Sequence, residues 1–172
     1  KNKLKNNKVV TTLMSNMGFE NYINSLGLQL IRTDVGDRNV INKMLEINSN
    51  VGGEQSGHII LSDHSKTGDG LLSAVQVLDI LTENGKKASE LFSLYDPIPQ
   101  IQKSVIVKEK NRSYYDNKKF KNFINDFKKN YKDLRLLIRP SGTEPIIRIL
   151  IEGKNISQLE SVAKEAEQLV ID

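Results

Sequence analysis

The sequence predicts an α/β protein made of two consecutive domains. In residues 1–96, apolar segments rich in β-branched residues alternate with amphipathic segments, a pattern typical of parallel strands joined by helices. Shorter strands and two helices are expected in residues 97–172. The junction is Asp96-Pro97-Ile98-Pro99, where two prolines break any helix and favour an extended connection.

The first domain has the predicted order β-α-β-α-β-α. Strands are expected at residues 9–14, within 28–35 and within 51–61, the last interrupted by a glycine-rich turn. Helices are expected at residues 19–26, from Asp37 onward and at 70–81, where Asp69 can cap the first turn. This order predicts a three-layer domain with a mostly parallel sheet. Ligands of such sheets bind beyond the carboxyl ends of the strands.

The second domain has the predicted order β-α-β-β-α. Strands are expected at residues 104–110, 134–138 and 146–151, and helices around residues 120–131 and 156–170. About 75 residues in this order predict a small α+β domain whose sheet is covered by helices on one face.

The composition excludes several classes of site. The 172 residues are 38% apolar and 27% charged, which is enough apolar surface for a packed core. The absence of cysteine excludes disulfide scaffolds, zinc ribbons and cysteine nucleophiles, and two histidines exclude a three-histidine metal site. Because the sequence shows neither a membrane span nor signal-peptide flanks, we expect a cytoplasmic protein without a membrane partner.

A basic stretch leaves a nucleic-acid-binding alternative to consider. Residues 101–135 carry 11 basic and 4 acidic side chains, with aromatic residues among them. However, Phe120, Phe123, Phe127 and Tyr131 share one helical face and are needed for a core. The nearby lysines are then expected on the solvated side, so no nucleic-acid partner is predicted.

Two glycine-containing segments carry candidate chemistry. In Gly52-Gly53-Glu54-Gln55-Ser56-Gly57-His58, flanking glycines predict an exposed turn, the carboxylate and hydroxyl suit sugar hydroxyls, and the imidazole can exchange protons. Arg139-Pro140-Ser141-Gly142-Thr143-Glu144-Pro145 is either a plain turn between strands or an anion cradle of hydroxyls, amides and a guanidinium. Arg148 follows in an apolar strand, where its partner is either a carboxylate such as Glu152 or a phosphate. Thr67-Gly68-Asp69-Gly70 has too few carboxylates for a metal cage, so we predict no metal site.

The two segments together resemble the α-D-phosphohexomutases. Gly53-Glu54-Gln55-Ser56-Gly57-His58 is similar to the sugar-recognition signature of that family, and Arg139 to Pro145 is similar to its phosphate-binding signature. They stand in the family's order, one in each domain. Thr12-Leu13-Met14-Ser15-Asn16 and Val35-Gly36-Asp37-Arg38 resemble the bacterial phosphoglucosamine mutase branch, and the similarity covers essentially the whole chain.

The resemblance implies interconversion of glucosamine 6-phosphate and glucosamine 1-phosphate through an enzyme phosphoserine and a bisphosphate intermediate. It implies sugar contacts by Glu54 and Ser56, proton transfer by His58, and a pocket lining that includes Gly36, Asp37 and Arg38. It also implies a phosphate site made of the side chains and turn amides of Arg139, Ser141, Gly142, Thr143 and Arg148.

The resemblance also implies that the chain is the third and fourth domains of a four-domain enzyme. The phosphorylatable serine loop and the DGDxDR magnesium loop are not found in these residues. We therefore expect magnesium in a full-length parent but none on this chain, preceding domains as partners, and no mutase activity from the chain alone. The alternatives are another phosphohexomutase, such as a phosphomannomutase or phosphoglucomutase, and a non-catalytic module that binds a sugar phosphate.

Overall fold

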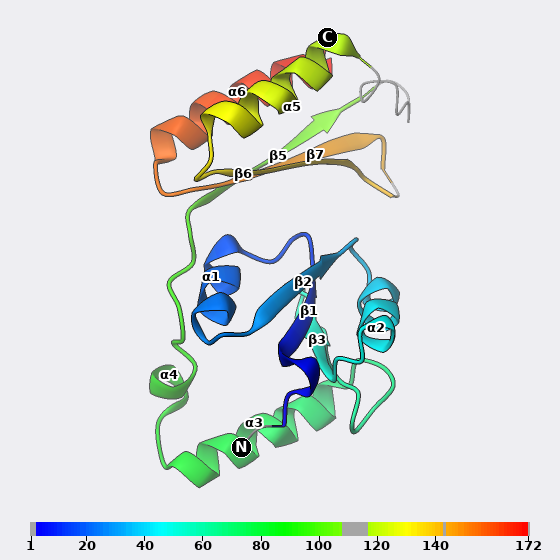
Figure 1. Ribbon diagram of the computed structural model, residues 1–172, viewed down its shortest axis with the longest axis vertical. Helices are drawn as coiled ribbons and strands as arrows, with labels where there is room; N and C mark the ends of the chain where they lie inside the picture. The colour runs from blue at the N-terminus through cyan, green and yellow to red at the C-terminus, as the bar shows by residue number, and fades with distance from the viewer. Residues whose placement is uncertain (1–2, 108–116, 143, 172) are drawn as a thin grey trace. The chain divides into compact units, whose positions relative to one another are not determined.

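The computed structural model describes residues 3–107, 117–142 and 144–171 (Figure 1). The chain divides into two compact units, Lys1–Pro97 and Ile98–Asp172. Each unit has its own β-sheet and its own apolar core.

The sheet of unit 1 has the strand order β2-β1-β3-β4. β1 (Lys8–Thr12) pairs in parallel with β2 (Gln29–Thr33) and with β3 (Val51–Gly53), and β4 (Ile59–Leu61) pairs antiparallel with β3. The expectation of one third strand within residues 51–61 is therefore wrong. The glycine-rich turn reverses the chain, so the segment forms a hairpin of two short strands. The mostly parallel sheet is confirmed by the other pairings.

Two helices cover opposite faces of this sheet (Figure 1). The chain steps from β1 to β2 through α1 (Met17–Ser25), and then back across β1 to β3 through α2 (Asp37–Glu46). Right-handed crossovers in opposite directions place the two helices on opposite faces. The apolar core beneath α2 consists of Val10, Val40, Met44 and Ile60. A short 3₁₀ turn, η1 (Lys5–Asn7), precedes β1.

The last part of unit 1 is α3 (Gly70–Asn84) followed by the short α4 (Ala88–Leu91). Asp69 caps α3 as predicted, since its side chain accepts a hydrogen bond from the Leu72 amide at 2.9 Å. The α4 segment returns the chain to α1, where Tyr95 packs against Phe19 and Tyr22. None of the helices in the described part of the chain combines the length and apolarity needed to cross a membrane.

Unit 2 has an antiparallel sheet in the order β5-β7-β6, with both helices on one face (Figure 1). The elements follow the predicted order: β5 (Gln100–Ile106), α5 (Lys118–Asn130), β6 (Arg135–Pro140), β7 (Ile146–Glu152) and α6 (Ile156–Ile171). The first strand starts earlier than predicted, and residues 108–110 of the predicted strand lie outside the described residues.

The core of unit 2 lies between the sheet and its helices. Alternate residues of β7 point into it, and α5 contributes the phenylalanines that its helical spacing predicts. The buried cluster consists of Val105, Phe123, Phe127, Ile147, Ile149, Ile151, Leu159, Val162, Ala163, Ala166 and Val170. Since β7 alternates, the residues between these isoleucines lie on the opposite, helix-free face of the sheet.

Candidate functional site

Three strands of unit 1 end at the same edge of its sheet. The parallel register pairs Thr12 with Thr33, and Val10 with Gly52, so the carboxyl ends of β1, β2 and β3 lie side by side. The segments that follow these strands begin at Leu13, Asp34 and Glu54. Both predicted segments of unit 1 therefore belong to the edge at which α/β sheets bind ligands.

The turn between β3 and β4 presents three candidate side chains from five consecutive residues. The Glu54 amide donates to the His58 carbonyl oxygen at 2.9 Å, and the Gly57 amide donates to the Glu54 carbonyl oxygen at 3.0 Å. Position 53 must be glycine for this closure, because a Cβ there would lie 2.7 Å from the His58 carbonyl oxygen. The turn is thus fixed by its own backbone.

The Glu54 and Ser56 side chains both face one ring nitrogen of His58, its Nδ1. The Ser56 Oγ lies 3.2 Å from the His58 Nδ1, and the Glu54 Oε2 lies 3.5 Å from the same atom. The imidazole is otherwise 56% exposed. Nδ1 is therefore the ring nitrogen of His58 that faces Glu54 and Ser56.

The turn is exposed at residues 55–58, as expected, but the Glu54 side chain within it is largely buried. Its side chain is only 9% exposed, and its Oε1 accepts a hydrogen bond from the Gly36 amide at 3.0 Å. Gly53 therefore permits a close approach of the backbone, whereas Gly57 is exposed and has a φ of +100°. Through this bond the structure brings together the two segments of unit 1 that the sequence identified separately.

Asp37 and Arg38 begin α2 directly beside this contact. The Asp37 Oδ1 accepts a hydrogen bond from the Arg38 amide at 2.7 Å, and both residues are exposed. The structure thus places Gly36 against Glu54 and leaves the Asp37 and Arg38 side chains accessible at the same edge.

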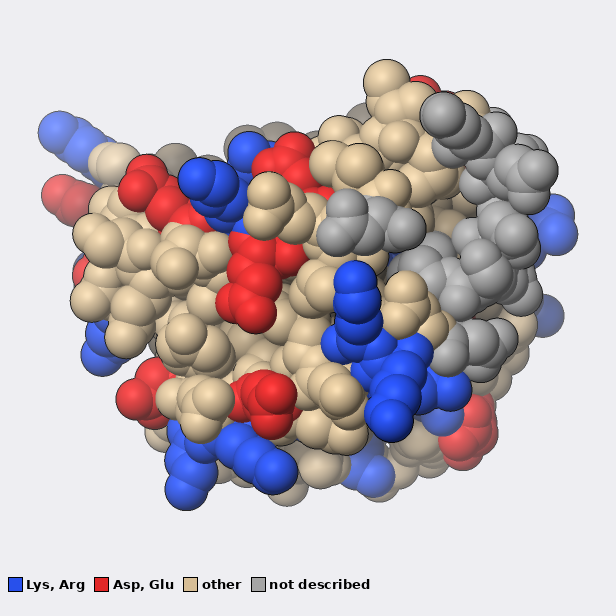
Figure 2. Space-filling view, turned by 90° about the horizontal axis from the view of Figure 1, so that it is seen from above, with Lys and Arg blue, Asp and Glu red and all other residues tan. Residues whose placement is uncertain are grey.

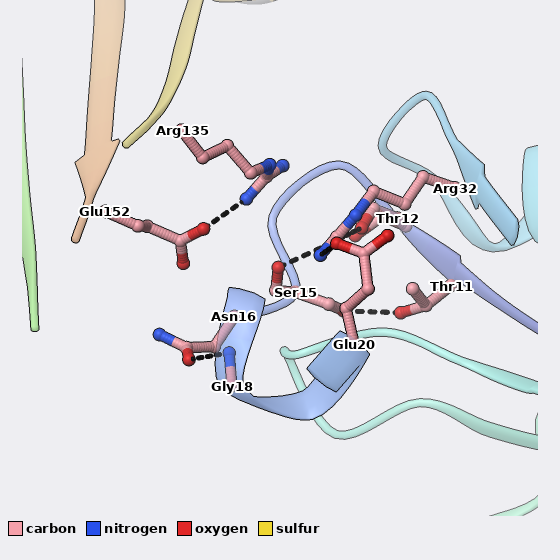
Figure 3. Close-up of polar contacts among 9 residues, drawn as sticks. All are labelled: Thr11, Thr12, Ser15, Asn16, Gly18, Glu20, Arg32, Arg135 and Glu152. Atoms are coloured by element: carbon pink, nitrogen blue, oxygen red, sulfur yellow. Dashed lines mark hydrogen bonds and ion pairs between the residues drawn. The ribbon is translucent and has the colours of Figure 1, made fainter. Parts of the chain in front are cut away.

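Sequence reasoning missed Arg32, which organises the segment after β1 (Figure 3). Its guanidinium is 12% exposed, donates to the Ser15 carbonyl oxygen at 2.6 Å and pairs with the Glu20 carboxylate at 3.0 Å. A buried cation needs such partners, because an unpaired one is costly. A lone arginine in an apolar strand was the available signal.

Hydroxyl groups join the segment after β1 to the turn after β3. The Thr11 Oγ1 donates to the Gly53 carbonyl oxygen at 3.0 Å and also hydrogen-bonds the Ser15 Oγ. Thr11, Thr12 and Ser15 are all buried. The segments after β1, β2 and β3 are therefore connected to one another by hydrogen bonds through Thr11, Ser15 and Glu54.

In unit 2, the second predicted segment connects β6 and β7. The Ser141 amide donates to the Ile146 carbonyl oxygen at 2.8 Å, which closes the hairpin, and the Ser141 Oγ accepts from the Glu144 amide at 3.3 Å. Gly142 is exposed in this turn, while Thr143 lies outside the described residues. The plain-turn interpretation is therefore correct locally, and it leaves the anion-site interpretation open.

The strand register places Arg139 and Arg148 directly opposite each other on the helix-free face of the sheet. Two like charges at such a pair repel each other, which favours an anion nearby. Arg148 pairs with the Glu144 carboxylate at 3.0 Å, and both side chains are about half exposed. This corrects the suggestion of Glu152 as its partner.

Glu152 is instead paired with Arg135, its cross-strand neighbour (Figure 3). The Glu152 side chain is fully buried, and its Oε2 accepts from the Arg135 guanidinium at 2.5 Å. The carboxylate beside Arg148 in the described structure is therefore the solvent-exposed Glu144, and phosphate binding by Arg148 stays a prediction.

The described part of the basic stretch, residues 101–107 and 117–135, exposes lysines and buries phenylalanines. Lysines 118, 119, 121, 128 and 129 are exposed on α5, while Phe120, Phe123 and Phe127 are buried, as the helical spacing predicts. Figure 2 shows Lys and Arg side chains beside Asp and Glu side chains on the face that it draws.

The described residues offer no magnesium cage. Within residues 3–107, 117–142 and 144–171, no group of three or more His, Asp or Glu side chains is placed to hold a metal ion. Among the described residues, hydrogen bonds from Lys5 and Asn50 lower the pKa of Asp63. Asp63 follows β4 and lies outside the candidate site.

Comparison with known proteins matches the whole chain. The family model of the phosphoglucomutase/phosphomannomutase α/β/α domain III covers residues 1–98, and the model of the C-terminal domain covers residues 100–169. The phosphoglucosamine mutase of Fusobacterium nucleatum is 44% identical over 99% of this chain, and that of Bartonella tribocorum is 45% identical over 98%. The chain spans 38% and 37% of their respective lengths.

Solved structures agree on the fold. An N-acetylphosphoglucosamine mutase from Aspergillus fumigatus, in complex with GlcNAc-6P and magnesium, has a TM-score of 0.79 at 21% identity. That similarity covers 99% of this chain and 42% of the other. A phosphoglucomutase/phosphomannomutase family protein from Burkholderia thailandensis has a TM-score of 0.68 at 17% identity, covering 94% of this chain and 36% of the other. The chain therefore belongs to the phosphoglucomutase/phosphomannomutase family, of which it carries domain III and the C-terminal domain.

Proposed function

We propose that this chain is the sugar-binding and phosphate-binding part of a phosphoglucosamine mutase, which interconverts glucosamine 6-phosphate and glucosamine 1-phosphate. The observation that carries the proposal is the contact between Glu54 and Gly36, because it unites two predicted sugar-binding segments at the ligand-binding edge of unit 1. Identities of 44% and 45% to phosphoglucosamine mutases favour this substrate over a plain hexose phosphate.

Unit 1 recognises the sugar in this proposal. Glu54 and Ser56 accept and donate hydrogen bonds to two sugar hydroxyls, and Asp37 and Arg38 line the same edge. His58 exchanges a proton with the substrate at Nε2, since its Nδ1 faces Ser56 and Glu54. A sugar that presents similar hydroxyls in two orientations could use these contacts in both half-reactions.

Unit 2 recognises the phosphate that is not reacting. Arg139 and Arg148 supply two cations from opposite positions of one strand pair, and Ser141, Gly142 and Thr143 supply turn amides and hydroxyls. Guanidinium groups suit this task because they bind phosphate oxygens through two parallel N–H groups. Phosphate binding requires Arg148 to exchange its exposed partner Glu144 for the ligand.

The remaining chemistry belongs, in this proposal, to preceding domains of a longer enzyme. The transferred phosphoryl group passes between an enzyme serine and the sugar through a bisphosphate, and magnesium supplies charge neutralisation there. Positioning groups alone do not replace a phosphoryl carrier. We therefore expect no mutase turnover from the 172-residue chain.

A ligand titration followed by backbone amide shifts tests the division of roles. Inorganic phosphate should shift Ser141 and Gly142, and glucosamine 6-phosphate should additionally shift Gly36, Glu54 and Ser56. Binding in the millimolar range, about 4 kcal/mol, is expected from a few charge-assisted contacts. Arg139→Ala should remove the unit 2 shifts and leave the fold intact.

Lys128→Ala is the matched control, because it removes an exposed cation from α5 without touching either segment. If phosphate shifts scatter over the α5 lysines and Lys128→Ala weakens them, the unit 2 assignment is wrong. If glucosamine 6-phosphate and inorganic phosphate give identical shifts, unit 1 does not recognise the sugar. Turnover by the chain alone would contradict the assignment of the reacting groups to other domains.

A further inference from the structure

We propose that Glu54 is a positioning residue that fixes the segment after β2 against the turn after β3, besides any contact it makes with sugar. The catalytic consequence rests on the proposed function. The structural part rests only on the contact between the Glu54 carboxylate and the Gly36 amide, 18 residues apart in sequence.

The burial, charge and distance of this contact are those of a well-formed hydrogen bond. The Glu54 side chain is 9% exposed, so its carboxylate has exchanged most of its water for protein partners. A hydrogen bond from a backbone amide to a carboxylate is charge-assisted and stronger than a neutral one. The 3.0 Å distance lies within the normal range for such bonds.

The backbone conformation of Gly36 suits this hydrogen bond. Its φ of +126° and ψ of 132° lie in a region that L-residues with a side chain avoid. This conformation turns the Gly36 amide toward Glu54 while the Gly36 carbonyl oxygen accepts from the Asn39 amide in the first turn of α2. A Cβ at this position would also meet the Asn39 side chain at 3.4 Å. The start of α2, with Asp37 and Arg38, is therefore set by the Glu54 contact.

The two oxygens of the Glu54 carboxylate have different partners. Oε1 holds Gly36, and Oε2 faces the His58 ring 3.5 Å away. A sugar hydroxyl that binds Glu54 must share these oxygens with protein groups. Ligand binding at the turn is thereby coupled to the segment that carries Asp37 and Arg38.

Selective ¹⁵N-glycine labelling of the 172-residue chain tests the contact directly, since it contains 11 glycines and yields a small set of amide signals. The Gly36 signal is identified by its loss in Gly36→Ala. Glu54→Gln should keep the protection of the Gly36 amide, because the side-chain oxygen still accepts. Glu54→Ala should speed hydrogen exchange of Gly36 about ten- to a hundredfold, the ratio for one lost charge-assisted hydrogen bond.

Gln55→Ala is the matched control, because it alters an exposed neighbour in the same turn. It should not change the hydrogen exchange of Gly36. If Gly36 exchanges equally fast in wild type and Glu54→Ala, with both variants folded, the proposal is overturned. If Gly36 is protected by Glu54 but does not respond to glucosamine 6-phosphate, the proposed function fails and the positioning role stands.

Discussion

The two hairpin turns that carry the candidate chemistry are built in opposite ways. The turn after β3 buries its carboxylate, since Glu54 is 9% exposed and bound to the Gly36 amide. The turn after β6 exposes its carboxylate, since the Glu144 side chain is 55% exposed and pairs with Arg148 of β7, which is 44% exposed. Both turns connect neighbouring antiparallel strands.

The difference follows from the ligand groups that each turn is proposed to bind. Sugar hydroxyls are neutral and are distinguished by the direction of a hydrogen bond, so a carboxylate held in one place is useful. A phosphate carries its own charge and attracts mobile guanidinium groups from several directions. Rigid placement should therefore matter more for the stability of the first turn than for that of the second.

The largest expected effect is a difference in the free energy of unfolding between two glycine substitutions, one in each hairpin. Gly53→Ala would bring a Cβ to within 2.7 Å of the His58 carbonyl oxygen, so the β3–β4 hairpin must open. We expect a loss of about 3 kcal/mol in the free energy of unfolding of unit 1, at the upper end for overpacking. Gly142→Ala meets no atom within 4 Å and should change the free energy by about 0.5 kcal/mol or less.

Chemical denaturation of both variants, followed by a signal from each unit, checks this pair. Equal losses in the two variants would show that the turns do not differ in rigidity. A loss of stability found only in Gly142→Ala would mean that the second turn, and not the first, is the rigid one.

The sequence predicted the architecture well because periodicity and turn chemistry are local. The spacing of Phe120, Phe123 and Phe127 predicts the buried face of α5, and Asp69 caps α3 as expected. The reversal between β3 and β4 was missed because each strand is only three residues long, too short for a periodic pattern. Glycines alone could not distinguish a kinked strand from a hairpin.

The contacts of the candidate site depend on long-range register and were less predictable. The bond from Gly36 to Glu54 spans 18 residues and requires β2 and β3 to flank β1. The partner of Arg148 depends on strand register, which places Arg135 opposite Glu152 and Arg139 opposite Arg148. Arg32 was overlooked because its main partners are a backbone carbonyl and Glu20, neither of which forms a recognisable sequence pattern.

The next largest effect is a difference in stability between variants of the two glutamates, Glu54 and Glu144. Glu54→Ala leaves the Gly36 amide without its charged acceptor and should cost about 2 kcal/mol of unfolding free energy. Glu144→Ala removes only a half-exposed ion pair and should cost well below about 1 kcal/mol. Thermal unfolding of both variants at neutral pH measures the difference. Equal costs would mean that burial of the Glu54 carboxylate contributes nothing to the stability of unit 1.

A smaller effect concerns phosphate affinity. Glu144→Gln frees Arg148 from its competing carboxylate, so inorganic phosphate should bind the unit 2 turn about two- to threefold more tightly. Glu160→Gln on α6 removes the same charge from an exposed position and serves as the control. Amide-shift titrations give both affinities. An equal gain in the two variants would assign the effect to net charge rather than to Arg148.

The smallest expected effect is a pH dependence at the end of β4 that lies away from the first turn. Asp63 follows β4, and hydrogen bonds from Lys5 and Asn50 lower its pKa below the ordinary value of 3.8. A carboxylate whose pKa is lower in the folded state stabilises the fold above its unfolded pKa, and this stabilisation disappears as the pH falls through the folded pKa. Asp63→Asn should therefore be less stable than wild type near neutral pH, and the difference should shrink below about pH 4.

Because Lys5 and Asp63 are exposed, added salt should also reduce the difference at neutral pH. Denaturation midpoints of both proteins across this pH range measure the effect. A difference that stays constant down to pH values well below 3.8 would show that the Asp63 side chain acts through neutral hydrogen bonds, and that the ion pair with Lys5 does not support β4.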